Sequence, residues 1–554
     1  MGPITRICSE LRSARPTSPK QGSTTRLRRG RLALASLLAL APGPALADIS
    51  GLAAYVRARV AGARGEPGRA AADYARALAI SPDIPVAIRA YREALAAGDL
   101  ELADRAIAIL DRAGVTPEDA MLLRVARAAR TGDAAALEAG TARLARTRLV
   151  ILAPVLRAWT ARARGGDPLA ALGATGTEPV ARRLATEARA FFLIATGREV
   201  EALTLIRSLG GIDAGSDLRI GAAQLLGGRG KINLARQLFP GDQAGMGVAL
   251  ARAGVGPSLG FGVSRLFARV AADLTSGDDP NPLAIALTRA ALLAEPGNDR
   301  ARLLLANALG KQGAADHALA VLGGIGANGP FARAAATARV ATLTRADRRP
   351  EALAHAARAV VRPEADRDDW QLYADLLADT GRVADSLPFY RRIAAGEGAD
   401  EWVVWMQLGG ALEQAGRWPE ARTALARAVD LAPDEPVALN YLAYARLSRG
   451  EATRDSTRLL ERAHRLAPEN AGITDSLGWA YHLTRDTPRA LPLLERAAEA
   501  EPTNAEIADH LGDAYWTLGR RFEARHAWTA AALVADGPDK VRIDAKLLTG
   551  PPGR

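Results

Sequence analysis

A short motif recurs at a nearly constant interval in the C-terminal part of this chain. Leu408-Gly409, Leu442-Ala443, Leu477-Gly478 and Leu511-Gly512 follow one another at intervals of 34, 35 and 34 residues, and Pro433, Pro468 and Pro502 repeat at 35 and 34. A period of this length is typical of repeat proteins, in which each unit packs mainly on its neighbours. The period therefore predicts a stack of similar units.

One unit reads as two short helices. From Leu477 the apolar residues fall at helical spacing, the pattern breaks over 484–488, and it resumes until Pro502. Pro502 lacks the backbone N–H that a helix interior needs, so it ends the second helix. Small residues at Gly478 and Ala490 let the two helices approach closely. Each unit is therefore expected to be a helical hairpin that shares its core with the next one.

The residues of these hairpins resemble the tetratricopeptide repeat family, whose pattern has Trp, Leu, Gly and Tyr on the first helix and Ala, an aromatic residue, Ala and Pro afterwards. The clearest matches are Trp405, Leu408, Gly409, Ala421, Ala428 and Pro433; Leu477, Gly478, Tyr481, Ala490, Ala497 and Pro502; and Leu511, Gly512, Tyr515, Ala524, Trp528 and Ala531. The resemblance implies an all-α fold, an α-α superhelix built as a solenoid of helical hairpins.

The same pattern continues upstream in weaker form. It includes Trp370 and Leu377, Ala352 and Ala359, then Leu305, Ala306, Ala318 and Pro330, and finally Ala70, Tyr74, Ala77 and Pro82. Around Asn440, Asp475 and Asp509 the chain also resembles exported bacterial tetratricopeptide-repeat proteins of unsettled function.

Glycine and proline clusters divide the chain. We expect a signal peptide at 1–47, N-terminal repeats at 48–133, diverged helical repeats with glycine-rich breaks at 134–279, a regular C-terminal array at 280–535 and a tail at 536–554. Within the tail, 543–548 are expected to form a last turn or a partial capping helix. The glycine-rich middle segment has two interpretations, diverged repeats or a hinge between two solenoid arms. The helical periodicity on both sides of its breaks favours diverged repeats.

Residues 1–47 have the layout of a secretory signal. Basic residues up to Arg31 precede the apolar run 32–41, and a small-x-small site ends at Ala47. We therefore expect export to the periplasm with cleavage after Ala47, and no transmembrane segment in the mature chain. The alternative is a cytoplasmic protein whose N-terminal segment is never cleaved.

The basic net charge of +11 is concentrated in that segment. Residues 1–47 contribute +7, and residues 48–554 carry 64 Lys and Arg against 60 Asp and Glu. The nearly balanced body gives no support to nucleic-acid binding. The low aromatic content of 5% fits an all-α chain.

The sequence holds no recognisable catalytic or metal-binding pattern. Gly227-Gly228-Arg229-Gly230-Lys231 lacks the following Ser or Thr and the preceding strand of a phosphate-binding loop, so a turn between helices is expected. The six histidines form no pair at metal-ligand spacing, and Cys8, the single cysteine, precedes the expected cleavage site. We therefore expect no catalytic residues, no metal and no cofactor.

A stripe of polar and aromatic residues marks the face of the first helices that turns away from the packing residues. Residues three or four apart share a helix face. The candidate groove residues are Met406, Glu413, Asn440, Tyr444, Asp475, Trp479, His482, Asp509, Asp513 and Trp516. Carboxylates beside aromatic rings suit a protein or peptide partner of basic or mixed charge. In the alternative interpretation the tryptophans pack on the next repeat and the acids are solvated.

Together these features predict a non-catalytic scaffold or adaptor in the bacterial cell envelope that binds a partner in its concave groove. One alternative is a subunit of an enzyme complex that makes or exports envelope polymers. A pocket gathering titratable groups with shifted pKa values would favour that alternative. The other alternative is a cytoplasmic assembly factor.

Overall fold

A computed structural model describes residues 46–173, 178–209, 214–239, 241–277, 279–363, 365–451 and 453–551. Throughout these ranges the regular structure is helical, and no strand occurs in them. The expected all-α fold is confirmed. The expected signal segment falls outside the described residues, except for Leu46 and Ala47 at the start of the first helix.

The described chain forms two compact units. Residues up to His355 belong to an N-terminal unit and residues from Ala356 to a C-terminal unit, so the division falls inside α20 (Arg349–Val360). Each unit has its own buried core.

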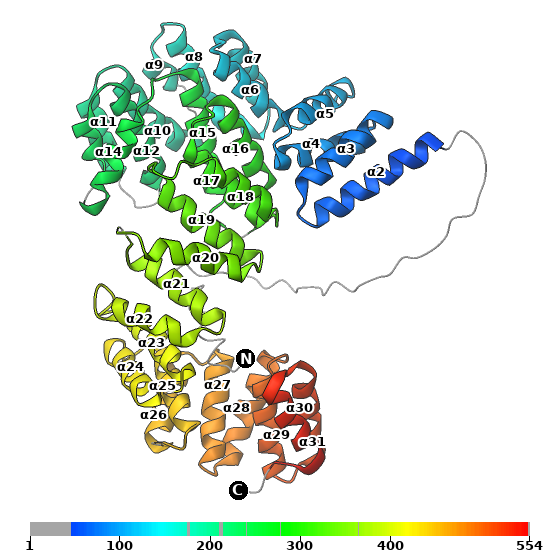
Figure 1. The fold of residues 1–554 in the computed structure, drawn as a ribbon, viewed down its shortest axis with the longest axis vertical. Helices are drawn as coiled ribbons and strands as arrows, with labels where there is room; N and C mark the ends of the chain where they lie inside the picture. Colours follow the sequence, from blue (N-terminus) through cyan, green and yellow to red (C-terminus); the bar gives the residue numbers. More distant parts are fainter. Residues whose placement is uncertain are drawn as a thin grey trace. The chain divides into compact units, whose positions relative to one another are not determined.

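The C-terminal unit is a row of helical hairpins followed by one further helix (Figure 1). The helices are α21 (Arg367–Asp379), α22 (Val383–Ala394), α23 (Trp402–Gln414), α24 (Trp418–Leu431), α25 (Pro436–Leu447), α26 (Thr453–Leu466), α27 (Ala471–Leu483), α28 (Thr487–Ala500), α29 (Ala505–Thr517), α30 (Arg521–Val534) and α31 (Gly537–Thr549).

Two features of the sequence shape these hairpins. Asparagine side chains cap first helices: Asn470 accepts from the backbone N–H of Ile473 at 3.0 Å, which satisfies a donor that the helix leaves open. Inside the hairpins, glycines let the paired helices approach closely. A Cβ atom at Gly478 would lie 2.8 Å from Cγ of Leu494, and one at Gly512 would lie 2.3 Å from Nε1 of Trp528. The predicted close approach at Gly478 is confirmed.

The first helices of the last hairpins contact one another, α25 with α27 and α27 with α29. They therefore form a continuous wall. Helix α31 packs on α30 at the end of the row, with Ile543 buried against Trp528. The tail that the sequence places at 536–554 thus contains a full helix.

The N-terminal unit has a less regular order of elements. Its helices are α2 (Leu46–Ala63), α3 (Pro67–Ile80), α4 (Ile84–Ala97), α5 (Leu100–Arg112), α6 (Ala120–Thr131), α7 (Ala134–Leu144), α8 (Ala153–Ala163), α9 (Pro168–Leu172), α10 (Pro179–Ala195), α11 (Glu199–Ser208), α12 (Ala214–Gly228), α13 (Ile232–Arg236), α14 (Ala244–Arg252), α15 (Leu259–Leu274), α16 (Pro282–Ala294), α17 (Asp299–Lys311), α18 (Ala315–Gly323) and α19 (Ala332–Arg345), with short 3-10 turns at Arg148–Leu152 and Gly241–Gln243.

This unit folds back on itself. Helices α7–α14 lie between α6 and α15 in the sequence, yet α16 packs on α6 and α4, and α15 packs on α6 and α8. One buried core consequently runs from Ala54 to Ala335. The helices from 282 to 345 therefore share the core of the N-terminal unit, whereas the repeat pattern predicts that a regular array begins at residue 280.

Gly227 and Gly228 end α12, and the turn that was expected between helices follows at Arg229 and Gly230, before α13. A Cβ atom at Gly227 would lie 2.0 Å from the carbonyl oxygen of Ala251, so the glycine serves the close approach of two backbones. Among the described helices none combines the length and the apolar character needed to cross a membrane.

Candidate functional site

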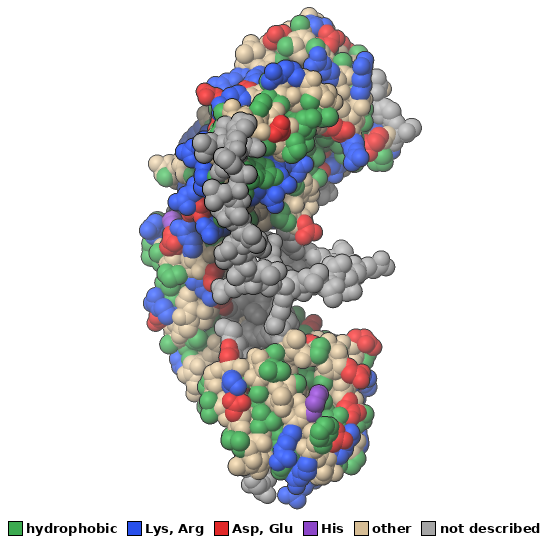
Figure 2. Space-filling view, turned by 90° about the vertical axis from the view of Figure 1, so that its right-hand side faces the viewer, with side chains coloured by type: hydrophobic (Ala, Val, Ile, Leu, Met, Phe, Trp, Pro, Cys, Tyr) green, Lys and Arg blue, Asp and Glu red, His purple; other side chains and the backbone are tan. Residues whose placement is uncertain are grey.

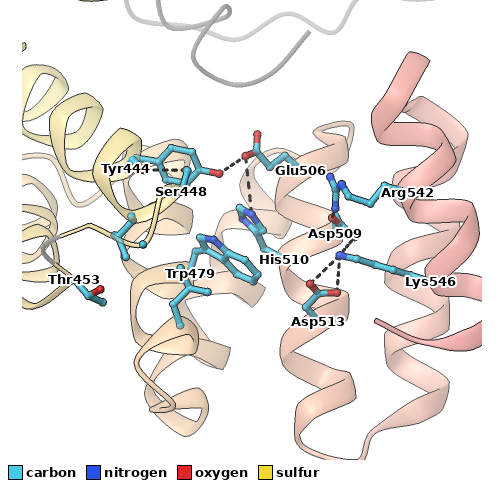
Figure 3. Close-up of a pocket in the computed structure, with 13 residues that line it drawn as sticks. Tyr444, Ser448, Thr453, Trp479, Glu506, Asp509, His510, Asp513, Arg542 and Lys546 are labelled. Carbon is cyan, nitrogen blue, oxygen red and sulfur yellow. Dashed lines mark hydrogen bonds and ion pairs between the residues drawn. The ribbon is translucent and has the colours of Figure 1, made fainter. Parts of the chain in front are cut away.

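A hollow of about 630 Å³ opens on the wall of first helices in the C-terminal unit (Figure 3). Successive hairpins and the last helix each contribute to it. Its lining consists of Tyr444, Leu447, Ser448, Gly450 and Thr453 from α25 to the start of α26, Trp479 and Leu483 from α27, Glu506, Asp509, His510 and Asp513 from α29, and Arg542 and Lys546 from α31. The four residues of α29 follow at intervals of three, one and three, which places them on one helix face.

His510 is the buried centre of this lining. Its Nδ1 atom lies 3.0 Å from Oδ2 of Asp475, and its ring stacks on Trp479 with 4.0 Å between ring centroids and 12° between ring planes. Burial lowers the pKa of His510, but the carboxylates of Asp475, Glu506 and Asp509 outweigh burial and raise it to about 9. At neutral pH the imidazole is therefore a cation held by an acid and an indole face.

Tyr444 and Glu506 form a second pair beside His510. The Tyr444 hydroxyl donates a hydrogen bond to Oε1 of Glu506, and the same oxygen lies 4.0 Å from Nε2 of His510. Burial, followed by the negative charge of Glu506, raises the pKa of Tyr444 well above its usual value. Burial also raises the pKa of Glu506. The Glu506 side chain remains 23% exposed, so it presents an acid to the hollow.

A third cluster joins α29 to α31. Nζ of Lys546 lies 2.8 Å from Oδ1 of Asp509 and 2.8 Å from Oδ2 of Asp513, and Arg542 forms an ion pair with Asp509. Asp513 also accepts from Nε1 of Trp528 at 3.2 Å. Burial raises the pKa of Asp513, and the charge of Lys546 opposes that rise. Asp509 and Lys546 are buried, whereas the Arg542 side chain is 48% exposed.

The structure brings together six of the ten residues that the sequence analysis proposed. Tyr444, Trp479, Asp509 and Asp513 line the hollow, and Asp475 lies behind His510. The ring of His482 stacks on Trp479 at 5.0 Å.

The other four residues lie outside the hollow. Met406 and Asn440 are buried in the hairpins, where no partner can reach them. Glu413 is held by Arg449 at 2.8 Å. Cζ of Arg521 lies 3.5 Å above the ring centroid of Trp516, and the ring centroids of Trp516 and Trp528 are 5.3 Å apart. Both Trp479 and Trp516 thus make packing contacts within the chain, and Asp475 and Asp509 are buried in ion pairs.

Glu506, His510, Arg542 and Lys546 were not among the predicted site residues. Two spacing signals could have found them. Glu506 and His510 are four residues apart, on the helix face that also carries Asp509 and Asp513. Arg542 and Lys546 are likewise four residues apart, in a segment that the analysis treated as a tail.

The lining gathers titratable groups with shifted pKa values, which is the observation that favours the enzyme alternative. Nevertheless each group has a partner inside the chain: His510 has Asp475, Tyr444 has Glu506, and Asp513 has Lys546. Within the ranges that the structure covers, no group of three His, Cys, Asp or Glu side chains is arranged to hold a metal ion.

Comparison with protein families identifies one matching segment. A sequence model of the family described as tetratricopeptide repeat matches residues 402–447, which comprise α23, α24 and α25. A comparison with curated protein sequences found no match.

Several solved structures are similar to parts of this chain. A structure of MamA (41-end) from Desulfovibrio magneticus RS-1 is 18% identical, with a TM-score of 0.27, and covers 30% of this chain and 94% of its own. YrrB, a TPR protein described as having an unusual peptide-binding site, is 15% identical, with a TM-score of 0.27. The match covers 34% of this chain and 97% of YrrB. A tetratricopeptide repeat protein from Parabacteroides merdae is 15% identical, with a TM-score of 0.38. The match covers 44% of this chain and 96% of that protein.

The identification rests on the matched segment 402–447 and on the row of hairpins with their closely packed glycines. The chain therefore contains a tetratricopeptide-repeat segment at residues 402–447.

Proposed function

We propose that this protein is a non-catalytic scaffold that holds a segment of a protein partner against the wall formed by α25, α27 and α29. The observation that carries this proposal is the hollow of about 630 Å³, to which three successive hairpins and α31 contribute. Repeat stacks expose extended surfaces of this kind, and their partners bind there. Tyr444 and Trp479 supply aromatic surface, which often dominates the binding energy of interfaces.

The charges in the hollow favour a partner segment of mixed charge. Glu506 offers a partly exposed carboxylate, and Arg542 offers a half-exposed guanidinium. Asp509 and Asp513 do not add free negative charge, because Lys546 and Arg542 already neutralise them. A lysine or arginine of the partner would therefore approach Glu506, and an acidic residue would approach Arg542.

The net charge of the C-terminal unit favours a partner whose bound segment contains basic residues. Residues 356–554 carry 25 Arg and Lys against 31 Asp and Glu, a net charge of −6. Such a field attracts basic partners and speeds their association.

Site-specific photocrosslinking in cells tests the groove. A photoreactive residue at Ser448, on the rim of the hollow, should capture a partner, whereas one at Thr529, exposed on α30, should not. The Ser448 crosslink should disappear in the Glu506→Lys variant if its far-UV circular dichroism is unchanged. Equal capture at both positions, or capture that survives Glu506→Lys, would contradict the proposal.

A reversal of Asp509 and Asp513 to lysine is a poor test. The two new lysines would face Lys546 and Arg542, so α31 would be repelled from α29. A loss of binding in that variant would therefore show only that α31 no longer packs on α29.

The proposed location is the periplasm, with the signal segment cleaved after Ala47. The support is the basic segment, the apolar run and the small-x-small site of residues 1–47. N-terminal sequencing of the purified protein should return Asp48 as its first residue. An intact Met1 would favour the cytoplasmic assembly factor.

The second candidate is a catalytic subunit acting on an envelope polymer. It is favoured by Glu506, a partly exposed acid whose pKa burial raises. In Glu506→Gln the amide retains the hydrogen bond from Tyr444 but transfers no proton. If Glu506→Gln restores the phenotype of a deletion strain, the scaffold is favoured; if it fails while the Ser448 crosslink persists, catalysis is favoured.

A further inference from the structure

The first and the last described helices each carry a second apolar stripe that is exposed to solvent. On α2, Leu52, Val56 and Val60 follow at intervals of four and are exposed, while Ala54, Ala58 and Ala61 on the other face are buried. On α31, Val541 and Leu548 are exposed by 71% and 82%, while Ile543 on the opposite face is buried. Repeat stacks normally end in helices with a polar outer face. Both terminal helices of this chain depart from that rule.

The stripe on α2 borders a hollow. A cavity of about 420 Å³ lies between α2 and α3, lined by Val56, Val60, Ala61 and Ala72 and by Arg57, Arg64, Glu66, Arg69, Asp73 and Arg76. Arg57 and Arg76 pair with Asp73, and Arg69 pairs with Glu66. Arg64 has no ion-pair partner among the described residues. This surface is therefore an apolar strip with a basic rim.

The two stripes belong to units of opposite net charge. Residues 48–355 carry 39 Arg and Lys against 29 Asp and Glu, a net charge of +10, whereas residues 356–554 carry −6. In Figure 2, basic side chains are frequent on the visible face of the N-terminal unit, and acidic side chains gather on part of the C-terminal unit.

We propose that α2 of one copy of this protein docks on α31 of a second copy, head to tail. The apolar strip of Val56 and Val60 would cover that of Val541 and Leu548, and the opposite charges of the units that carry them would steer the encounter. A contact between two α2 helices would bring two arginine-rich rims together. On α31 the exposed charges pair with one another, Lys540 with Asp544 and Arg542 with Asp539, so a contact between two α31 helices is opposed by the net charge of −6 that each C-terminal unit carries. Charge therefore selects the heterologous pairing, which leaves a free end on each copy and allows a chain of copies.

The contact is small, because it joins one helix face to another. Interfaces of this size are weak and transient. We expect self-association that grows with protein concentration and weakens when apolar contact is removed from either side.

Sedimentation equilibrium tests the proposal on protein purified from cells that express the whole chain. The wild-type mass should rise with concentration beyond that of a dimer. Val56→Gln with Val60→Gln, and Val541→Gln with Leu548→Gln, should each be monomeric because each removes one of the two surfaces. All four positions are exposed, so circular dichroism should be unchanged. Val200→Gln, at an exposed valine on α11 outside both stripes, is the matched control and should associate like wild type.

Mixing the two double variants gives the decisive result. Each retains the surface that the other lacks, so an equimolar mixture should form a one-to-one dimer that grows no further. A wild-type protein that stays monomeric at every concentration would overturn the proposal and would favour residues 1–45 or another protein as the occupant of α2. A variant of α31 that remains a dimer would also overturn it, since the contact would then join two α2 helices.

Discussion

His510 shows how much of the candidate site depends on single charges. A buried imidazole would ordinarily be neutral, because burial disfavours its charged form. Here Asp475 lies 3.0 Å away and Trp479 covers the ring, so the cation is retained in the core of the C-terminal unit. The folded state therefore binds a proton that the unfolded chain releases near neutral pH.

This proton makes stability depend on pH. The pKa of His510 rises from 6.5 to about 9 on folding, so the stabilisation is fully present below pH 6.5 and is lost as the pH rises through about 9. A shift of this size corresponds to about 3 kcal/mol. We expect thermal stability to fall between these pH values more steeply in wild type than in His510→Gln. An imidazole NMR resonance of His510 that titrates near pH 6.5 would contradict this account.

The glycines of the first helices are required by the packing of the second helices. Gly512→Ala would place a Cβ atom 2.3 Å from Nε1 of Trp528, so the variant should lose about 1–3 kcal/mol of unfolding free energy. Gly472→Ala, on α27, is the matched control, because its Cβ would meet only Oδ1 of Asn470 at 3.5 Å. The control should be neutral or slightly stabilising. Equal losses in both variants, measured by thermal denaturation, would contradict close packing at Gly512.

The residues of the candidate site could be predicted from the sequence only in part. Tyr444, Trp479, Asp509 and Asp513 share helix faces because of their spacing, and they line the hollow; that they bind a partner stays a prediction. Their burial could not be predicted, since it depends on the neighbouring hairpin and on α31. Met406 shows the same limit: it has the right spacing, but it lies in the core.

Among the helices, α31 is the one whose role the sequence concealed. It follows the last repeat signal, and the sequence predicted a tail there with no more than a last turn or a partial capping helix at 543–548. The structure shows that it supplies Lys546 and Arg542 to the acids of α29. One helix thus closes the end of the hairpin row by charge as well as by the burial of Ile543.

Removing the buried lysine should be costly. In Lys546→Met, Asp509 and Asp513 lose their shared buried cation, and we expect a loss of about 3–5 kcal/mol in unfolding free energy. Adding Asp513→Asn should recover part of that loss, because one of the two acids is then neutral. Lys540→Met, which breaks an exposed pair with Asp544 on the same helix, should cost under about 1 kcal/mol. Chemical denaturation would contradict the account if the two lysine variants were equally stable.

At the scale of the whole chain, the repeat period predicted the hairpins of the C-terminal unit because each contact there is local. The N-terminal unit differs, since α15 and α16 return to pack on α6 over more than a hundred residues of sequence. A repeat period cannot predict this long-range packing of α15 and α16 on α6. It depends on contacts such as Trp159 of α8 with Phe261 of α15, whose ring centroids are 5.8 Å apart.

The two units should therefore respond differently to a local defect. A Cβ atom at Gly262 would lie 2.2 Å from the ring of Trp159, so Gly262→Ala disturbs the one core that joins Ala54 to Ala335. We expect hydrogen exchange to accelerate in α3, α6, α15 and α16 together, because a continuous core opens as one cooperative unit. Gly512→Ala should accelerate exchange only in α27–α31, because hairpins in a row interact with their neighbours alone. Faster exchange confined to α8 and α15 in Gly262→Ala would show that the N-terminal unit also opens helix by helix.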